Sequence, residues 1–207
     1  MDEMLAPVIA IPQNLENMQL PAPELLTYYT DLEERIVWMD DEVSNLTLEI
    51  ARYVMQWNRE DRDIPIDKRK PIKLMFFSPG GSLYVNNLLI DVITASRTPV
   101  YGYNLGMAFS AGAFIYLACH KRYALPRATF LFHKGDGAFS GITANVANAS
   151  KEYDRQINEL VDFVVERTSI PRITANKKMN ADWYITADEA HEKYMFVDEI
   201  ITSLDQI

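Results

Sequence analysis

The sequence predicts an α/β fold built around a largely parallel sheet. Three apolar runs, at residues 72–77, 100–105 and 129–133, have the length and composition of buried strands. A helical pattern of apolar residues follows each of the first two runs, and strands that alternate with helices at this spacing are typical of βα units. The chain of 207 residues is long enough for one domain with a sizeable core.

The segments before the first of these runs complete the predicted order of elements. Residues 1–24 hold four prolines among scattered apolar residues, which indicates an extended N-terminal arm and leaves residues 25–207 for the domain. Residues 35–39 form a short β-rich run, and Ser44 precedes an amphipathic helical pattern. Residues 58–71 are polar with two prolines, so we expect a surface loop.

A long helix is predicted over residues 143–168, because apolar residues recur there at three- and four-residue steps. At about 1.5 Å per residue the helix would be a rod of roughly 39 Å, and globular helices average only about 11–12 residues. We therefore expect its apolar stripe to contact another subunit, with packing inside its own chain as the alternative. The stripe consists of Val146, Ala149, Tyr153, Ile157, Leu160 and Val164.

Composition excludes several functional classes. A net charge of −9 argues against a nucleic-acid surface, which needs clustered Lys and Arg. The single cysteine, Cys119, cannot form an internal disulfide, and its apolar surroundings predict a buried thiol. The N-terminus lacks the features of a signal peptide, and no run reaches the roughly 18 apolar residues of a membrane span. These observations predict a cytoplasmic protein.

Two turns follow the predicted strands, and ligands gather at this edge of open α/β sheets. The turn Ser78–Gly81 ends in a glycine pair, which allows close backbone approach to a ligand but is also typical of a simple tight turn. Ser110 ends the second turn, among small neighbours at the start of an apolar helix. The amide groups of a helix N-terminus can stabilise a developing oxyanion. The alternative is that Ser110 only caps the helix.

A serine nucleophile needs a base within hydrogen-bond reach, and the chain has three histidines. His120 and His191 lie in polar stretches and are expected to be exposed. His133 ends a predicted strand at the same sheet edge as Ser110, although a histidine can also end a strand by chance. A third group must orient the imidazole, and spacing alone leaves several carboxylates open. The candidates are Asp182, Asp188, Glu189 and Asp198.

Four segments together are far more specific than any one of them. They are FFSPGGSLYVNNLLIDVI, GMAFSAGAFIYLAC, KRYALPRATFLFH and DWYITADEAHEKYMFVDEI. In order, spacing and character they resemble the ClpP family, the proteolytic subunit of the ATP-dependent Clp protease, and the resemblance covers roughly residues 25–203. It implies a ClpP/crotonase-like fold of repeated ββα units in a peptidase domain at residues 25–207. The family's protruding helical handle would occupy about residues 134–168.

The resemblance also implies which residues carry the chemistry. The family's nucleophile lies in a motif similar to GMAFSAGA and carries over to Ser110, and its base carries over to His133. Its aspartate stands four residues before a Ser/Thr-Ala-x-Glu-Ala motif and carries over to Asp182. The oxyanion would be held by the amides of Gly81 and Ala111. The implied activity is that of a serine endopeptidase.

By the same resemblance, subunits would form heptameric rings, stacked as a tetradecamer, in whose chamber unfolded polypeptides are cleaved. An AAA+ unfoldase of the Clp type would feed them in. The chain has no GxxxxGK[ST] motif, so ATP use would belong to that partner. No cofactor or metal is expected in the chain. Two alternatives remain open: a catalytically weak paralogue that forms mixed rings with an active ClpP, and a crotonase-fold enzyme acting on acyl-CoA, which would not need the three catalytic groups together.

Three segments depart from the family pattern and indicate a divergent member. Where the family has Gln-Pro and a glycine-rich strand that binds substrate, this chain has Lys134–Ala138. Residues 176–180 lack the acidic and arginine residues that contribute to contacts between rings. The loop at residues 58–71 is also longer than usual.

Overall fold

The computed structural model describes residues 23–207, and the chain divides into two compact units, residues 1–34 and residues 35–207. In the first unit the structure describes one helix, α1 (Pro23–Glu33). Residues 1–22, which make up most of the predicted N-terminal arm, lie outside the described residues. Pro23 and the residue after it begin α1 instead of ending an extended arm, and proline is well tolerated in the first turn of a helix.

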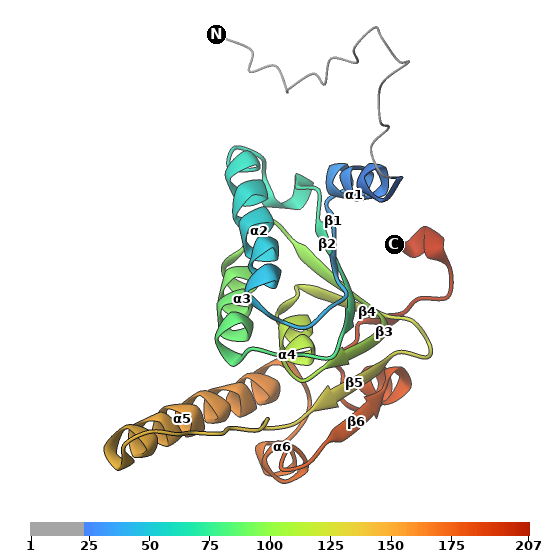
Figure 1. The fold of residues 1–207 in the computed structure, drawn as a ribbon. Coiled ribbons are helices and arrows are strands. Elements are labelled where there is room, and N and C mark those ends of the chain that lie inside the picture. Colours follow the sequence, from blue (N-terminus) through green and yellow to red (C-terminus); the bar gives the residue numbers. More distant parts are fainter. Residues whose placement is uncertain (1–22) are drawn as a thin grey trace, which may run out of the picture. The chain divides into compact units, whose positions relative to one another are not determined.

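A seven-stranded, largely parallel sheet forms the centre of the second unit, which confirms the predicted fold class (Figure 1). Its strands run in the order β1-β2-β3-β4-β7, and β5 pairs with both β3 and β6. Of these pairings, only β5 with β6 is antiparallel. The strands are β1 (Ile36–Met39), β2 (Ile72–Ser78), β3 (Val100–Phe109), β4 (Lys121–Ala124), β5 (Thr129–Phe132), β6 (Trp183–Thr186) and β7 (Glu199–Ile200).

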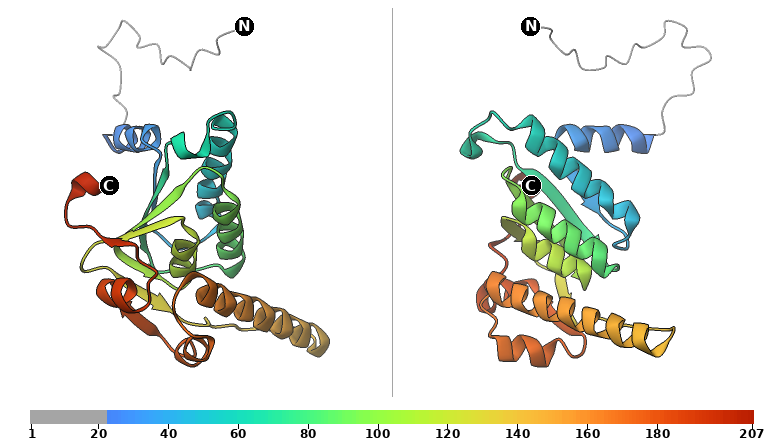
Figure 2. Two further views of the ribbon diagram at one scale, coloured as in Figure 1. Left: turned by 180° about the vertical axis from the view of Figure 1, so that it is seen from behind. Right: turned by 90° about the vertical axis from the view of Figure 1, so that its left-hand side faces the viewer.

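Three helices lie side by side against one face of the sheet (Figures 1 and 2). They are α2 (Leu48–Glu60), α3 (Leu83–Ala95) and α4 (Ala111–Ala118). All eight residues of α4 are buried, as expected for a helix that is apolar on every side. Two further helices, α5 (Thr143–Arg167) and α6 (Arg172–Lys178), follow later in the chain. No helix within residues 23–207 combines the length and the apolar character needed to cross a bilayer.

Aromatic side chains fill the core between α4 and the sheet. Phe130 on β5 lies 4.9 Å from Tyr116 of α4 and 5.0 Å from Phe196, measured between ring centroids. Phe132, the last residue of β5, packs edge-on against Phe114 at 5.5 Å. Because protein interiors are close-packed, these contacts hold the end of β5 and the start of α4 in a defined relation.

The predicted long helix over residues 143–168 is confirmed within one residue, and its apolar stripe divides into two parts. Ile157, Leu160 and Val164 are buried in the chain's own core. Ala149, in the N-terminal half, is exposed, and this half projects away from the sheet (Figures 1 and 2). Packing inside the chain therefore explains the second half of the stripe. A subunit contact for the first half stays a prediction.

The segment at residues 58–71 is not only a surface loop. Its first residues end α2, and it contributes two buried charged side chains, Asp61 and Arg69. Arg35 donates to both carboxylate oxygens of Asp61, at 2.6 and 2.8 Å. Thr98 donates to the same carboxylate at 2.9 Å and accepts from Arg69 at 3.3 Å. This polar network fastens the segment to the edge of the sheet, a role that its composition did not reveal.

Candidate active site

The turn from β3 into α4 places Ser110 at the edge of the sheet. Ser110 has φ 51° and ψ −122°, a combination that costs free energy for any residue with a Cβ. Its amide donates to Leu131 O at 2.8 Å, and its carbonyl oxygen accepts from Ala113 N at 3.0 Å, so the neighbouring strand and helix hold the strained turn. The Ser110 side chain makes no capping hydrogen bond to α4. The alternative that it only caps the helix is therefore wrong.

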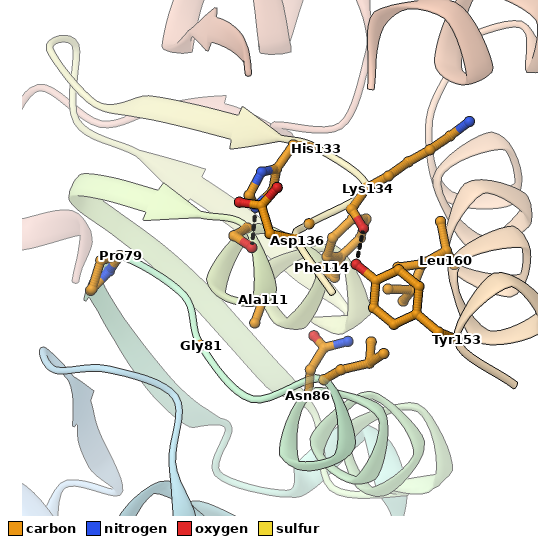
Figure 3. A pocket seen from close by; sticks show the side chains of 14 residues that line it. Pro79, Gly81, Asn86, Ala111, Phe114, His133, Lys134, Asp136, Tyr153 and Leu160 are labelled. Carbon is orange, nitrogen blue, oxygen red and sulfur yellow. Dashed lines mark hydrogen bonds between the residues drawn. The ribbon is translucent and has the colours of Figure 1, made fainter. Parts of the chain in front are cut away.

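His133 follows the last residue of β5 and faces Ser110. β5 pairs in parallel with the end of β3, where Phe109 lies opposite Leu131, so both strands end at the same edge. The result is a distance of 2.7 Å between Ser110 Oγ and His133 Nε2. Figure 3 shows this contact as a dashed line below the imidazole.

Asp182 reaches the other side of the same imidazole through the antiparallel pair β5–β6. Trp183 begins β6 opposite Phe132, so the residue before Trp183 lies beside the residue after Phe132. Asp182 Oδ1 is 3.3 Å from His133 Nδ1, with 57% of the aspartate side chain and 24% of the histidine side chain exposed. A carboxylate beside Nδ1 favours the tautomer with a proton on Nδ1, which leaves Nε2 free to accept a proton from serine.

Two of the other carboxylates considered as third member accept hydrogen bonds from backbone amides elsewhere, and Asp188 lies just before the helical turn Glu189–Lys193. Asp198 accepts from the Arg122 amide at 2.7 Å. Glu189 accepts from the Thr186 amide at 3.4 Å on the turn after β6. Among the contacts of His133 in residues 23–207, the ion pair with Asp182 is the one that involves a carboxylate.

His120 and His191, which the sequence predicted to be exposed, are exposed. His120 Nδ1 accepts from Val100 N at 3.0 Å, and His191 Nδ1 lies 2.9 Å from Val197 O. The thiol of Cys119 is buried as predicted, and burial raises its pKa to about 12. Within residues 23–207, no cluster of three or more His, Cys, Asp or Glu side chains could hold a metal ion.

Two backbone amides beside Ser110 are free to donate. Val43 anchors the glycine turn from both sides, because its amide donates to Gly80 O and its carbonyl oxygen accepts from Ser82 N, each at 2.7 Å. Between these two bonds, the amide of Gly81 has no acceptor within the described part of the chain. The amide of Ala111 opens α4, where no intrahelical acceptor exists, and it too is unpaired within residues 23–207. Both residues line the same pocket as Ser110.

This pocket has a volume of about 320 Å³ and lies between α3, α4, α5 and the segment after β5 (Figure 3). Its apolar wall comes from Leu83, Phe114, Ile157 and Leu160, and its polar lining includes Asn86, Lys134, Asp136 and Tyr153. Tyr153 of α5 donates to Lys134 O at 2.8 Å and so ties the segment after His133 to the long helix. We did not single out Asn86 or Asp136 from the sequence; the signal available for Asn86 was a polar pair, Asn86-Asn87, inside an apolar helical pattern.

Comparisons with known proteins agree with this geometry. A family model described as Clp protease matches residues 24–204. ATP-dependent Clp protease proteolytic subunit 2 of Mycolicibacterium paratuberculosis is 34% identical over 176 residues, covering 83% of this chain and 84% of that protein. ATP-dependent Clp protease proteolytic subunit of Dehalococcoides mccartyi is 29% identical over 204 residues, covering 96% and 97%.

The fold is similar to that of a solved ClpP structure. A solved structure of a ClpP1 mutant from Listeria monocytogenes superposes with a TM-score of 0.73 at 23% identity, and the match covers 87% of this chain and 98% of that one. At this identity the superposition establishes the fold, a mixed α/β architecture of the ClpP type. Together with the family match over nearly the whole described chain, it leads to one conclusion: the chain belongs to the Clp protease family.

Proposed function

We propose that this chain is a serine endopeptidase that cleaves peptide bonds by acyl transfer, with Ser110 as nucleophile, His133 as general base and Asp182 as the group that orients the imidazole. The observation that carries the proposal is the 2.7 Å contact between Ser110 Oγ and His133 Nε2, with a carboxylate at the other ring nitrogen. A serine hydroxyl becomes an effective nucleophile only with a base in such a position.

In the first step, Ser110 Oγ attacks the carbonyl carbon of the substrate while His133 Nε2 takes the hydroxyl proton. The imidazolium that forms is stabilised by the negative charge of Asp182, 3.3 Å from Nδ1. The C–N bond then breaks as His133 returns the proton to the leaving amine. Water, activated by the same imidazole, releases the acyl group from Ser110.

Negative charge develops on the substrate oxygen during both steps. The unpaired amides of Gly81 and Ala111 line the pocket beside Ser110 and supply two donors for this oxygen. Such fixed donors cost no reorganisation when the charge appears, and loss of one donor typically reduces the rate by about 10²–10³. This chemistry uses side chains and amides of the chain itself and calls for no metal or cofactor.

We further propose that the chain acts as the proteolytic subunit of an ATP-dependent Clp protease, as the named relatives do. The exposed N-terminal half of α5 is suited to contact a neighbouring subunit in a ring. ATP use would belong to a partner unfoldase that delivers unfolded polypeptides. Heptameric rings, stacking of two rings and a cytoplasmic location are parts of this proposal.

An active-site probe tests the chemistry. A fluorophosphonate should label the parent protein at Ser110, and labelling should disappear in Ser110→Ala. Ser203→Ala removes an exposed hydroxyl near the C-terminus and should label like the parent. Asp182→Asn should slow labelling by about 10²–10⁴ because the wrong tautomer is favoured. Labelling that persists in Ser110→Ala, or is absent from the parent protein, overturns the peptidase proposal.

The assembly has its own test. Light scattering of the purified protein should show a particle many times larger than the 23.7 kDa chain. A stable monomer would contradict the ring and the subunit contact proposed for α5, and would leave the chemistry to be judged by the probe.

A further inference from the structure

Asn86 places an unpaired polar atom at the pocket. The residue is only 1% exposed, yet its Oδ1 has no hydrogen-bond partner in the described part of the chain. Figure 3 shows the Asn86 side chain extending from α3 toward the pocket, below Ala111 and Phe114. Buried polar atoms in proteins nearly always have a partner, so an exception in a binding pocket indicates a group reserved for a ligand.

A chain of side-chain amides runs from Asn86 across to α5. Asn86 Nδ2 donates to Asn87 Oδ1 at 3.0 Å, and Asn87 Nδ2 donates to Gln156 Oε1 at 3.0 Å. Gln156 Nε2 then donates to Glu152 Oε1 at 2.8 Å. Gln156 is itself buried, with 4% of its surface exposed, so the chain links two helices through the protein interior.

The far end of this chain determines which atom faces the pocket. Arg155 donates to both carboxylate oxygens of Glu152, and this contact, with the bond from Gln156, lowers the pKa of Glu152 to about 2. An ionised carboxylate can only accept hydrogen bonds, so Gln156 must turn its NH₂ group toward Glu152. Each amide along the chain must then donate in the same direction. Asn86 is left with its carbonyl oxygen, an acceptor, at the pocket end.

The rest of the pocket indicates what would bind there. Leu83, Phe114 and Leu160 provide apolar walls for the stem of a long side chain. The two charged lining residues, Lys134 and Asp136, have opposite signs, so they give the pocket no net charge. A single neutral acceptor cannot replace the hydration of a buried ammonium or guanidinium group.

We propose that Asn86 is a specificity-determining residue, which selects substrates whose acyl residue carries an uncharged N–H donor at the end of an apolar stem, as glutamine does. The acyl residue is the one that supplies the carbonyl attacked by Ser110. This inference rests on the proposed peptidase function. Glutamine would donate to Asn86 Oδ1, whereas an apolar residue of the same length would leave that buried atom unpaired.

Peptidyl phosphonate probes that differ only in the acyl residue test the proposal. The residues are glutamine, methionine, and 5-oxonorleucine, a methyl ketone that has CH₃ in place of the NH₂ group of glutamine and so keeps its length and carbonyl but has no N–H. For the parent protein we expect the rate constant for labelling Ser110 to be about 10–100 times larger with glutamine than with either analogue. In Asn86→Leu, which fills a similar volume without the acceptor, the preference should disappear or turn toward methionine.

Two further variants sharpen the result. Asn45→Leu makes the same change at an exposed position that does not line the pocket, and should keep the preference of the parent. Asn87→Leu breaks the amide chain and frees Asn86 to rotate, so discrimination between glutamine and its ketone analogue should weaken even if Asn86→Leu does not fold.

The outcomes separate the two proposals. An unselective fluorophosphonate reports whether Ser110 is reactive at all, and its failure would count against the peptidase function. If that probe labels the parent but methionine equals or exceeds glutamine, the role of Asn86 is refuted. The same holds if the preference for glutamine is unchanged in both Asn86→Leu and Asn87→Leu.

Discussion

Gly80 is a position where a single added methyl group should disturb the candidate active site. Its φ of 97° lies in the region that favours glycine, and a Cβ built there would lie 2.6 Å from Ser110 Cβ and 2.7 Å from Phe109 O. Neither atom is the end of a flexible side chain. Gly80→Ala must therefore push apart the glycine turn and the strained turn that carries Ser110.

Gly141 allows the cost of the backbone conformation to be separated from the cost of overpacking. It also has a positive φ, 135°, but a Cβ added there would meet no atom within 4 Å. Both alanine variants cost about 1–3 kcal/mol for a backbone conformation that residues with a Cβ rarely adopt, and both gain the same small amount from a less flexible unfolded chain. Gly80→Ala alone adds the cost of overpacking, about 1–3 kcal/mol. This last amount is the expected difference between the two variants.

Urea unfolding at one fixed protein concentration measures that difference. We expect Gly80→Ala to have a free energy of unfolding about 1–3 kcal/mol below that of Gly141→Ala. Fluorophosphonate labelling of Ser110 should fall about 10²-fold in Gly80→Ala, since misplacing a reacting group by about 1 Å costs this much, and should be unchanged in Gly141→Ala. Equal stability and equal labelling rates in the two variants would refute the packing argument.

Two further predictions concern buried groups away from the site. Asp61→Asn should lower the free energy of unfolding by about 3–5 kcal/mol near neutral pH, because it removes the carboxylate that pairs with the Arg35 guanidinium at 2.6 and 2.8 Å and leaves it with Glu60, 4.0 Å away. The hydrogen bonds from Arg35 lower the pKa of Asp61 in the folded protein below its ordinary 3.8. The ionised carboxylate therefore stabilises the fold fully above about pH 4, and this stabilisation is lost as the pH falls through the pKa that Asp61 has in the folded protein. The difference in free energy of unfolding between the parent protein and Asp61→Asn should therefore become smaller when unfolding is measured at decreasing pH. A difference that stays constant down to pH 2 contradicts an ionised Asp61. The Cys119 thiol, completely buried and with a pKa raised to about 12, should not react with a thiol reagent at pH 8 until the protein is unfolded, after which one equivalent reacts. Rapid reaction of the native protein would show that this part of the core opens.

The sequence predicted β2 and β3 as continuous apolar runs, because most of their residues are buried or half-buried and such runs are long enough to recognise. β3 nevertheless extends to Phe109, beyond the run predicted at residues 100–105. β4, β6 and β7 have four, four and two residues, and their pairing comes from the sheet and not from any local pattern. The helical pattern was expected to follow Ser44 directly, but Ser44 caps a short 3₁₀ turn (Asn45–Thr47), in which Leu46 is 83% exposed, and α2 begins only at Leu48.

The candidate site shows the same division between local and tertiary information. Ser110 and His133 could be placed from sequence, because each follows a recognisable strand and parallel strands end at one edge. Asp182 could be chosen only through the resemblance to the ClpP family, since its position depends on the antiparallel pairing of β5 with β6, which the spacing of residues in the sequence does not predict. The hydrogen-bonded chain of amides from Asn86 to Glu152 could likewise not be predicted from the sequence, because its central bond joins Asn87 and Gln156, which are 69 positions apart.

The three groups of the proposed catalytic triad differ in how firmly the fold holds them. Ser110 stands between β3 and the fully buried α4, and His133 extends from β5, which pairs on both sides. Asp182 precedes β6, an edge strand whose one partner in the sheet is β5, and the chain just before it is tied to the segment after His133 by a hydrogen bond from Lys134 N to Met179 O at 2.8 Å. Edge elements with few partners open at lower cost than core strands. The contact between imidazole and carboxylate, 3.3 Å against 2.7 Å for imidazole and hydroxyl, is therefore the part of the triad that movement of β6 or α6 would adjust first.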